Sequence, residues 1–296
     1  MFYPCERKKM GKGTRAMTVV VSLTKEAPGG VYREDKNVPE HLKTLRIPPA
    51  WKNVMVNSDP EAKCWARGHD VKGRVCSLYA PHHVKAASEA KFNKIKKLLT
   101  VAHKIEAKLN KAINKPGPSD VVVVAYMIYM MGLRPGSKTD TLADKQAYGA
   151  TTLQARHVKR MGSGAIWLDF IGKKGVTIHL KVHDMRLGDL LFWRKEESQG
   201  RRIVPIFDVS NSALNKYLKT LHPTLNPKDL RTMKANVVAA EFMEGKRIPQ
   251  VKTKAKKLLR NLFIHVSKIL GNTPAIVKKS YVSPEITKPL TDVIGV

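Results

Sequence analysis

Tyr281 lies in the stretch LGNTPAIVKKSYVSP, residues 270–284, directly after two lysines and a serine. A tyrosine at this position is either a surface aromatic side chain or a nucleophile that attacks a phosphate group. A phenol has a pKa of about 10, so a nucleophilic tyrosine needs nearby cations that favour its anion. The sequence supplies such cations, because it has no acidic residue between Glu244 and Glu285 but ten lysines and arginines. A basic run of this length favours a surface that faces phosphates.

The residues just before Tyr281 predict a short helix. Thr273 is a good N-cap and Pro274 fits the first helical position, which puts Tyr281 two turns along the helix. Asn272 is then either a plain capping residue or an amide that donates a hydrogen bond to a phosphate oxygen. The sequence leaves both interpretations of Asn272 open.

Three further cations stand at unusual positions. Arg134 in GLRPGS follows a helix stop and precedes a proline, so it lies on a constrained loop. Arg231 falls in the predicted first turn of NPKDLRTM, where the helix dipole disfavours a cation unless an anion binds beside the free amides. Lys173 occupies the tip of a predicted hairpin, where a lysine points either into solvent or into a groove. Each of these residues alone is compatible with a structural or surface role.

The charge of the whole chain indicates the kind of partner. The 296 residues include 54 Lys and Arg against 24 Asp and Glu, which gives a net charge of +30 and a pI near 10.1. So large an excess opposes compaction unless a polyanion neutralises it, and nucleic acid is the commonest such partner. An anionic membrane is the rival partner, but the sequence has no apolar run long enough to span a bilayer.

Cysteine usage and the first residues bear on location. The three cysteines, Cys5, Cys64 and Cys76, are odd in number and lack metal-ligand spacing, which suits a reducing compartment. The start, MFYPCERKKMGKGTRAM, lacks the apolar core of a secretory signal and is typical of a flexible basic arm. We therefore expect a protein that is cytoplasmic, nucleoid-associated or viral, and not secreted.

The elements that must position these residues form an α+β pattern. Residues 17–80 are rich in short strands, MTVVVSLT, NVMVNS and a hairpin of CWARGHD and RVCSLYA. From Pro81 onward, apolar residues recur at helical spacing, first in one long amphipathic helix that reaches Ile113. We place the domain boundary near residue 82, so that residues 1–82 and 83–296 form two domains.

The second predicted domain is mainly helical with one small antiparallel sheet. DVVVVAYMIYMM predicts a buried helix that Gly132 ends, and AIWLDFIGKKGVTIHLKV predicts a hairpin with Lys173 at its tip. We expect a third strand within TTLQARHV. Further helices are predicted over residues 184–197, 210–221, 228–244 and 251–270.

Several motifs together resemble a known family. GLRPGS, YGATTLQARHV, FIGKKG, KDLRT and LGNTPAIVKKSYVSP occur in the order and approximate spacing of type IB DNA topoisomerases, in their compact poxvirus-like and bacterial form. RIPPAWKNV and the GHDVKGRV…LYAPHHV region resemble that family's small N-terminal domain. The resemblance runs from about Val31 to about Pro284. A single motif such as GLR is weak, whereas the ordered set is specific.

The resemblance implies a fold and a set of site residues. The fold would be a small β-rich, DNA-clamping N-terminal domain followed by a mainly α-helical catalytic domain with a small antiparallel sheet, as in tyrosine recombinases. The catalytic set would be Tyr281, Arg134, Lys173, Arg231 and Asn272. Where poxvirus enzymes have histidine at the fourth position of their set, bacterial-type members tend to have asparagine, as here. DNA-binding residues would be Arg67, Lys72, Arg74, Tyr79, Arg156, Lys174 and Lys279.

The resemblance also implies a reaction. Tyr281 would attack a backbone phosphate, form a 3′-phosphotyrosyl bond and release a 5′-hydroxyl. Arg134 and Arg231 would bind the non-bridging oxygens, Asn272 would add a neutral hydrogen bond, and Lys173 would protonate the leaving 5′-oxygen. Exchange of one phosphate ester for another needs no ATP, and we expect no cofactor and no metal. The expected partner is double-stranded DNA, with no membrane, and the expected protein is a monomer.

Two rival functions remain. A tyrosine recombinase shares the chemistry and would carry motifs much like GLRPGS and LGNTPAIVKKSY, but such proteins usually begin with a helical DNA-clamping domain. A non-enzymatic DNA-packaging protein would explain the charge but not the ordered arginine, lysine and tyrosine motifs. We rank the topoisomerase first, the recombinase second and the packaging protein third.

Overall fold

A computed structural model describes residues 19–20, 40–43, 45–57, 59–142 and 146–295. The chain divides into two compact units, Met1–Phe92 and Asn93–Val296. The division falls within one continuous helix, α2 (Pro81–Thr100). Most of the predicted strand MTVVVSLT lies outside the described residues.

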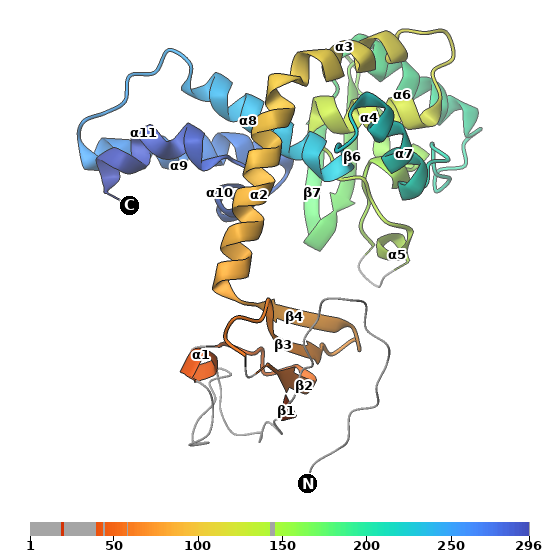
Figure 1. The fold of residues 1–296 in the computed structure, drawn as a ribbon. Coiled ribbons are helices and arrows are strands. Elements are labelled where there is room, and N and C mark those ends of the chain that lie inside the picture. The colour runs from red at the N-terminus through yellow and green to blue at the C-terminus, as the bar shows by residue number, and fades with distance from the viewer. Residues whose placement is uncertain (1–18, 21–39, 44, 58, 143–145, 296) are drawn as a thin grey trace. The chain divides into compact units, whose positions relative to one another are not determined.

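The first unit is built on a four-stranded antiparallel sheet, in agreement with the predicted richness of this region in short strands (Figure 1). Its strands follow chain order: β1 (Val19–Val20), β2 (Lys52–Val56), β3 (Cys64–His69) and β4 (Val75–Tyr79). A short helix, α1 (Glu40–Lys43), precedes β2. A small core of Leu42, Ile47, Val54, Val56 and Ala66 holds this unit together. The predicted hairpin of β3 and β4 is confirmed.

The second unit is mainly helical. It contains the end of α2 and then α3 (Ala102–Ile113), α4 (Asp120–Met131), α5 (Lys138–Thr141), α6 (Met185–Glu197), α7 (Asn211–Leu221), α8 (Pro227–Met243), α9 (Lys252–Leu270), α10 (Pro274–Ser280) and α11 (Pro284–Ile294). The predicted buried helix is confirmed as α4, which packs against α3, α7 and α8. It ends at Gly132, whose φ of 64° is left-handed and therefore favours glycine. Helix α9 packs against α8, α10 and α11.

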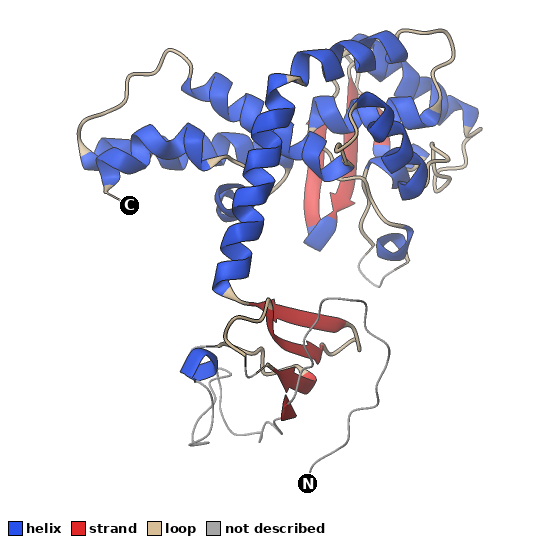
Figure 2. Ribbon diagram, viewed as in Figure 1, coloured by secondary structure: helices blue, strands red, loops and turns tan. Residues whose placement is uncertain are grey.

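A three-stranded antiparallel sheet lies within this second unit. Its strands are β5 (Val158–Arg160), β6 (Ile166–Gly172) and β7 (Val176–Lys181). The predicted hairpin is confirmed, and the turn η3 (Lys173–Gly175) joins its strands. The third strand was predicted too early, because residues 150–157 form two short 3₁₀ turns, η1 (Ala150–Thr152) and η2 (Ala155–His157), before β5 begins. Figure 2 shows the resulting α+β class, with one small antiparallel sheet in each unit.

Two helical predictions need correction. The long helix predicted up to Ile113 is broken at Val101, whose φ of −111° and ψ of 10° are not helical, so α2 and α3 are separate. Thr100 and Val101 are both β-branched, and the Thr100 hydroxyl bonds the carbonyl of Lys97, which competes with the helix. Helix α11 was not predicted, and it contains Pro289 in its interior. Pro284 occupies the first helical position.

Candidate active site

The candidate nucleophile lies at the end of α10. Thr273 caps this helix by accepting a hydrogen bond from the backbone N–H of Ile276 (3.4 Å), and Pro274 takes the first position as predicted. Asn272 is therefore not the capping residue. Tyr281 follows the last helical residue, and its backbone N–H bonds the Val277 carbonyl (3.0 Å). Tyr281 is only 7% exposed, so the alternative of a surface aromatic is wrong.

Arg231 is held next to this tyrosine by backbone carbonyls. Its guanidinium donates to the carbonyls of Gly132 and Leu270, which lie at the C-terminal ends of α4 and α9. Such helix ends carry partial negative charge and therefore favour a cation. The guanidinium carbon lies 5.3 Å from the centre of the Tyr281 ring. Because α8 begins at Pro227, Arg231 is its fifth residue and not, as predicted, in the first turn.

Burial changes the acidity of Arg231 without removing its charge. Arg231 is 3% exposed. This burial lowers its pKa to about 10, Tyr281 acts in the opposite direction, and Arg134 lowers the pKa further. Arg231 therefore remains a cation at neutral pH.

Arg134 approaches from the loop after α4. Its Nη2 donates to Oδ1 of Asn272 at 2.5 Å, which orients the amide so that Nδ2 is left to donate. Nδ2 of Asn272 and Nε of Arg231 are buried, and neither has a hydrogen-bond partner among the described residues. Buried donors are usually paired in folded proteins, so these two are available to an acceptor that enters the site.

The phenol of Tyr281 is acidified by these neighbours. Burial raises the pKa of Tyr281, but the charges of Arg231 and Arg134 lower it. The nearby hydrogen-bond donors of Arg231 and Asn272 lower it as well, because they favour the anion. The net effect is a pKa below the ordinary value of a phenol. This is the environment that the sequence argument required of a nucleophilic tyrosine.

Lys173 reaches the same place from the β6–β7 hairpin. It lines a small pocket together with Arg134 and Arg231, and the other lining residues are Leu133, Tyr148, Phe170, Gly172, Ile178 and Leu270. Its side chain is exposed at the tip of the hairpin. A backbone hydrogen bond from Tyr148 to the Ile171 carbonyl (2.8 Å) ties the hairpin to the segment that follows the Arg134 loop. The five predicted catalytic residues thus converge within the second unit, although they come from four separate segments of the chain.

The predicted DNA-binding residues divide between the two units. In the second unit, Lys174 and Lys279 are exposed, and Arg156 donates from Nη2 to the Tyr148 hydroxyl (2.7 Å). In the first unit, Lys72 and Arg74 lie on the β3–β4 turn, and Arg67 and Tyr79 lie on the strands.

The first-unit residues differ in how they are held. Arg74 forms an ion pair with Asp70 (2.6 Å). The pKa of Asp70 is lowered chiefly by its hydrogen bond from the Arg74 side chain. The buried Nε of Arg67 has no hydrogen-bond partner among the described residues. Tyr79 is 52% exposed, and its ring lies 5.5 Å from that of His83.

Asn236 was missed by the sequence analysis. It is 1% exposed, and its Nδ2 donates to the carbonyls of Thr232 (2.7 Å) and Tyr281 (2.8 Å). Its Oδ1 accepts from the backbone N–H of Ser283 (2.8 Å). This side chain therefore fixes the backbone on both sides of Val282. The available signal was a lone amide in the apolar run ANVVAA of a predicted helix, since a buried polar group needs specific partners.

Comparisons with known proteins identify the family. Residues 81–292 match the family described as eukaryotic DNA topoisomerase I, catalytic core. DNA topoisomerase 1B of Acanthamoeba polyphaga mimivirus is 31% identical over 262 residues, which cover 82% of this chain and 77% of that protein. The chain belongs to the type IB DNA topoisomerase family.

Poxvirus relatives support the same family. Two of these relatives are DNA topoisomerase I of Monkeypox virus and DNA topoisomerase 1B of Vaccinia virus (strain Western Reserve). Each is 24% identical to the present chain over 268 residues. Each alignment covers 88% of this chain and 84% of the relative. The recombinase and packaging alternatives are therefore set aside.

Among the described residues, no three His, Cys, Asp or Glu side chains gather as a metal site requires. Over the same part of the chain, no helix is both long and apolar enough to cross a bilayer.

Proposed function

We propose that this type IB topoisomerase relaxes supercoiled DNA by transient cleavage of one strand, with Tyr281 as the nucleophile. The phenolate attacks a backbone phosphate, a 3′-phosphotyrosyl ester forms, and the 5′-oxygen leaves as a hydroxyl. The observation that carries this proposal is a buried tyrosine whose pKa is lowered by two arginines despite its burial. A tyrosine that only packed in the core would be expected to have a raised pKa instead.

The arginines and Asn272 bind the phosphate in this proposal. Two of the five guanidinium N–H groups of Arg231 are used by backbone carbonyls, which leaves donors for a non-bridging oxygen. Nδ2 of Asn272 and Nε of Arg231 are the buried donors without partners, and phosphate oxygens would accept from them. Donors fixed before the reaction stabilise the charge that develops on those oxygens in the transition state.

Lys173 protonates the leaving 5′-oxygen. An alkoxide is a strong base and leaves poorly, so a general acid speeds the step. Lys173 is exposed at a hairpin tip and lines the pocket that Arg134 and Arg231 also line, which supports this role. Because one phosphate ester is exchanged for another, religation by the 5′-hydroxyl needs no ATP.

The remaining assignments concern how DNA is held. We assign residues 1–82 to a DNA-clamping domain, in which Arg67, Lys72, Arg74 and Tyr79 contact the duplex. In the catalytic domain, Arg156, Lys174 and Lys279 contact the backbone near the cleaved phosphate. The partner is double-stranded DNA, the protein acts as a monomer, and the catalytic fold resembles that of tyrosine recombinases. The excess of 54 cationic over 24 acidic residues supports a polyanionic partner.

The test is relaxation of supercoiled plasmid of either sign, with chelator present and nucleotide absent. Wild-type protein should relax several unrelated plasmids, while Tyr281→Phe, which keeps the ring but lacks the attacking oxygen, should bind DNA and relax none. Relaxation by both proteins would mean that Tyr281 is not the nucleophile or that a contaminant acts. No relaxation by wild-type protein on any plasmid would contradict the proposed function.

A further inference from the structure

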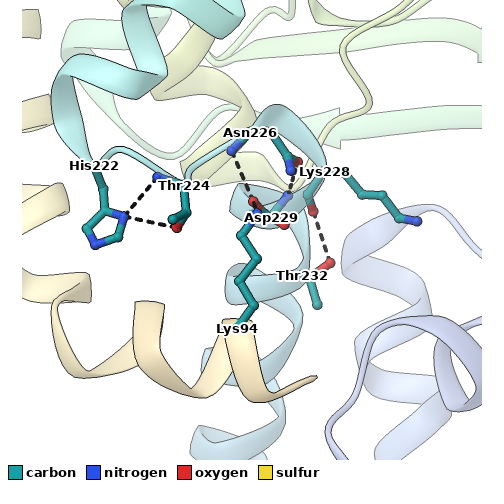
Figure 3. Close-up of polar contacts among 7 residues, drawn as sticks. All are labelled: Lys94, His222, Thr224, Asn226, Lys228, Asp229 and Thr232. Carbon is teal, nitrogen blue, oxygen red and sulfur yellow. Dashed lines mark hydrogen bonds and ion pairs between the residues drawn. The ribbon is translucent and has the colours of Figure 1, made fainter. Parts of the chain in front are cut away.

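Asp229 is a buried carboxylate in the first turn of α8. It is 6% exposed, and its Oδ2 accepts from the backbone N–H of Asn226 at 3.0 Å. In return, Oδ1 of Asn226 accepts from the backbone N–H of Asp229 at 3.0 Å. This reciprocal capping box, drawn in Figure 3, fixes the first turn of α8.

A lysine from α2 completes the surroundings of this carboxylate. Figure 3 shows the Lys94 side chain extending from α2 to the start of α8, where its Nζ lies 2.5 Å from Oδ2 of Asp229. The two side chains are 32% and 9% exposed, so the pair is largely shielded from water. Loss of one partner from such a pair leaves an uncompensated buried charge, which is strongly unfavourable.

The same helix provides a comparison. Lys96 of α2 forms an ion pair with Glu285 of α11 at 2.9 Å, but these side chains are 65% and 62% exposed. Exposed ion pairs of this kind contribute little to stability. Both lysines lie on α2, but the Lys94 pair is largely buried and reaches α8, whereas the Lys96 pair is exposed and reaches α11.

The position of Asp229 relative to Arg231 connects the buried pair with the active site. Residues two apart on a helix point about 200° apart, so these side chains leave α8 on opposite faces. On one face, Asp229 meets Lys94. On the other, Arg231 meets the carbonyls of Gly132 and Leu270. A rotation or shift of the start of α8 must therefore disturb contacts on both faces.

We propose that the Lys94–Asp229 ion pair is a positioning element for Arg231, which holds the start of α8 so that the guanidinium stays against the Tyr281 ring. The proposal rests on the proposed function, in which Arg231 binds the scissile phosphate. Lys94 and Asp229 act through Arg231 and are assigned no contact with the reacting atoms.

The first test measures cleavage of a DNA duplex in a single turnover at saturating protein. Lys94→Met should lower the cleavage rate about 10- to 100-fold, the scale expected for a small misplacement of a reacting group. The dissociation constant for DNA should change much less. Lys96→Met, which removes the same charge from the same helix, should stay within about twofold of the wild-type rate. If both variants behave alike, the proposal is overturned.

The second test asks whether the effect passes through Arg231. Against an Arg231→Ala background, Lys94→Met should cost no further cleavage rate, because the group that it positions is gone. Losses that multiply in the double variant would overturn the proposal, since they would indicate general damage to the fold. Wild-type protein that fails to cleave would instead refute the proposed function.

A third measurement covers the case in which Lys94→Met folds poorly. Asp229→Asn keeps an acceptor for the Asn226 N–H but removes the ion pair without leaving a buried charge. Lys94→Met should cost nothing more when added to Asp229→Asn. The absorbance of Tyr281 can be followed during a pH titration after subtraction of the spectrum of the protein that carries Tyr281→Phe. In the folded Asp229→Asn protein, Tyr281 should ionise at a higher pH than in wild type. An unchanged titration together with a wild-type cleavage rate would overturn the proposal.

Discussion

Two opposing effects act on the hydroxyl of Tyr281. Burial favours the neutral phenol, whereas the charges of Arg231 and Arg134 favour the phenolate, and the pKa falls below its ordinary value because the charges prevail. The phenolate is the nucleophile in our proposal, so the lowered pKa increases the reactive fraction at a given pH. The same two arginines are assigned to the phosphate, and they therefore act on both the nucleophile and its target.

This acidity predicts the pH dependence of cleavage. The rate should rise with pH as the phenol ionises and should level off at a lower pH than for a free phenol of pKa about 10. Arg134→Gln removes a charge that lowers the pKa of Tyr281, so the midpoint should move to higher pH and part of the lost rate should return there. Cleavage rates across the pH range test this.

A control separates this local effect from a general change in charge. Lys216→Gln removes an exposed charge on α7 and should leave the midpoint unchanged. If Arg134→Gln also leaves the midpoint unchanged, Arg134 does not act on the phenol.

The acid role of Lys173 can be tested by chemistry at the leaving group. Lys173→Ala should slow cleavage by about two to four orders of magnitude. Replacement of the bridging 5′-oxygen by sulfur should restore most of the loss, because a thiolate leaves without protonation. Arg231→Ala should not be rescued by sulfur. Equal rescue of both variants would contradict the assignment of the acid to Lys173.

The loop that carries Arg134 depends on a close crossing of two backbone segments. A side-chain carbon added at Gly149 would lie 2.6 Å from the Arg134 carbonyl oxygen and 2.6 Å from the backbone nitrogen of Gly136. The backbone N–H of Ala150 also bonds the Arg134 carbonyl at 2.8 Å. Glycine at position 149 therefore lets the segment before η1 approach the loop and hold it.

We expect Gly149→Ala to displace this loop. Backbone atoms must move to admit the methyl group, so the cleavage rate should fall by about tenfold or more and the melting temperature should drop. Gly162→Ala is the matched control, because nothing lies within 4 Å of the carbon added there. Single-turnover cleavage and thermal unfolding of both variants provide the measurement. A wild-type rate for Gly149→Ala would show that the crossing does not position Arg134.

Local patterns predicted most of the elements, whereas the helix break that was missed has only a weak local signal. The apolar run before Gly132 and the two lysines between alternating strands specify α4 and the β6–β7 hairpin by themselves. The break at Val101 was missed because two β-branched residues only weaken a helix, and the apolar spacing continues across it.

The same distinction applies to the active site. Motif resemblance selected five residues that the structure brings together, but it gave no information on what holds them. Arg231 bonds two backbone carbonyls that lie 99 and 39 residues away in the chain. Asn236 and the Lys94–Asp229 pair act through tertiary contacts of the same kind. Apart from the lone amide of Asn236 in an apolar run, such contacts have no signature in residue type or spacing.

The charge of the protein is unevenly distributed along the chain. Helix α9 has no acidic residue, and Lys254, Lys256 and Lys257 are exposed on its first turns. A net charge of +30 indicates that binding to a polyanion should depend steeply on salt, because each neutralised phosphate releases counterions.

Salt dependence of DNA binding tests the contribution of α9. If about seven phosphates are neutralised, log K against log salt should have a slope near −6, at roughly −0.9 for each phosphate. Joint replacement of Lys254, Lys256 and Lys257 by Gln should make the slope shallower. Binding isotherms over a range of salt concentrations provide the measurement. An unchanged slope would remove this face of α9 from the DNA-binding surface.

The main-chain anchoring of Arg231 has a consequence for sequence divergence. The carbonyls of Gly132 and Leu270 bond the guanidinium through atoms that every residue type carries. Substitutions around the site can therefore accumulate without loss of these acceptors, as long as α4 and α9 still end at the same places. This chain is only 24% identical to the poxvirus proteins over most of its length. An arginine anchored on helix ends is one way in which an active site could persist through that much change.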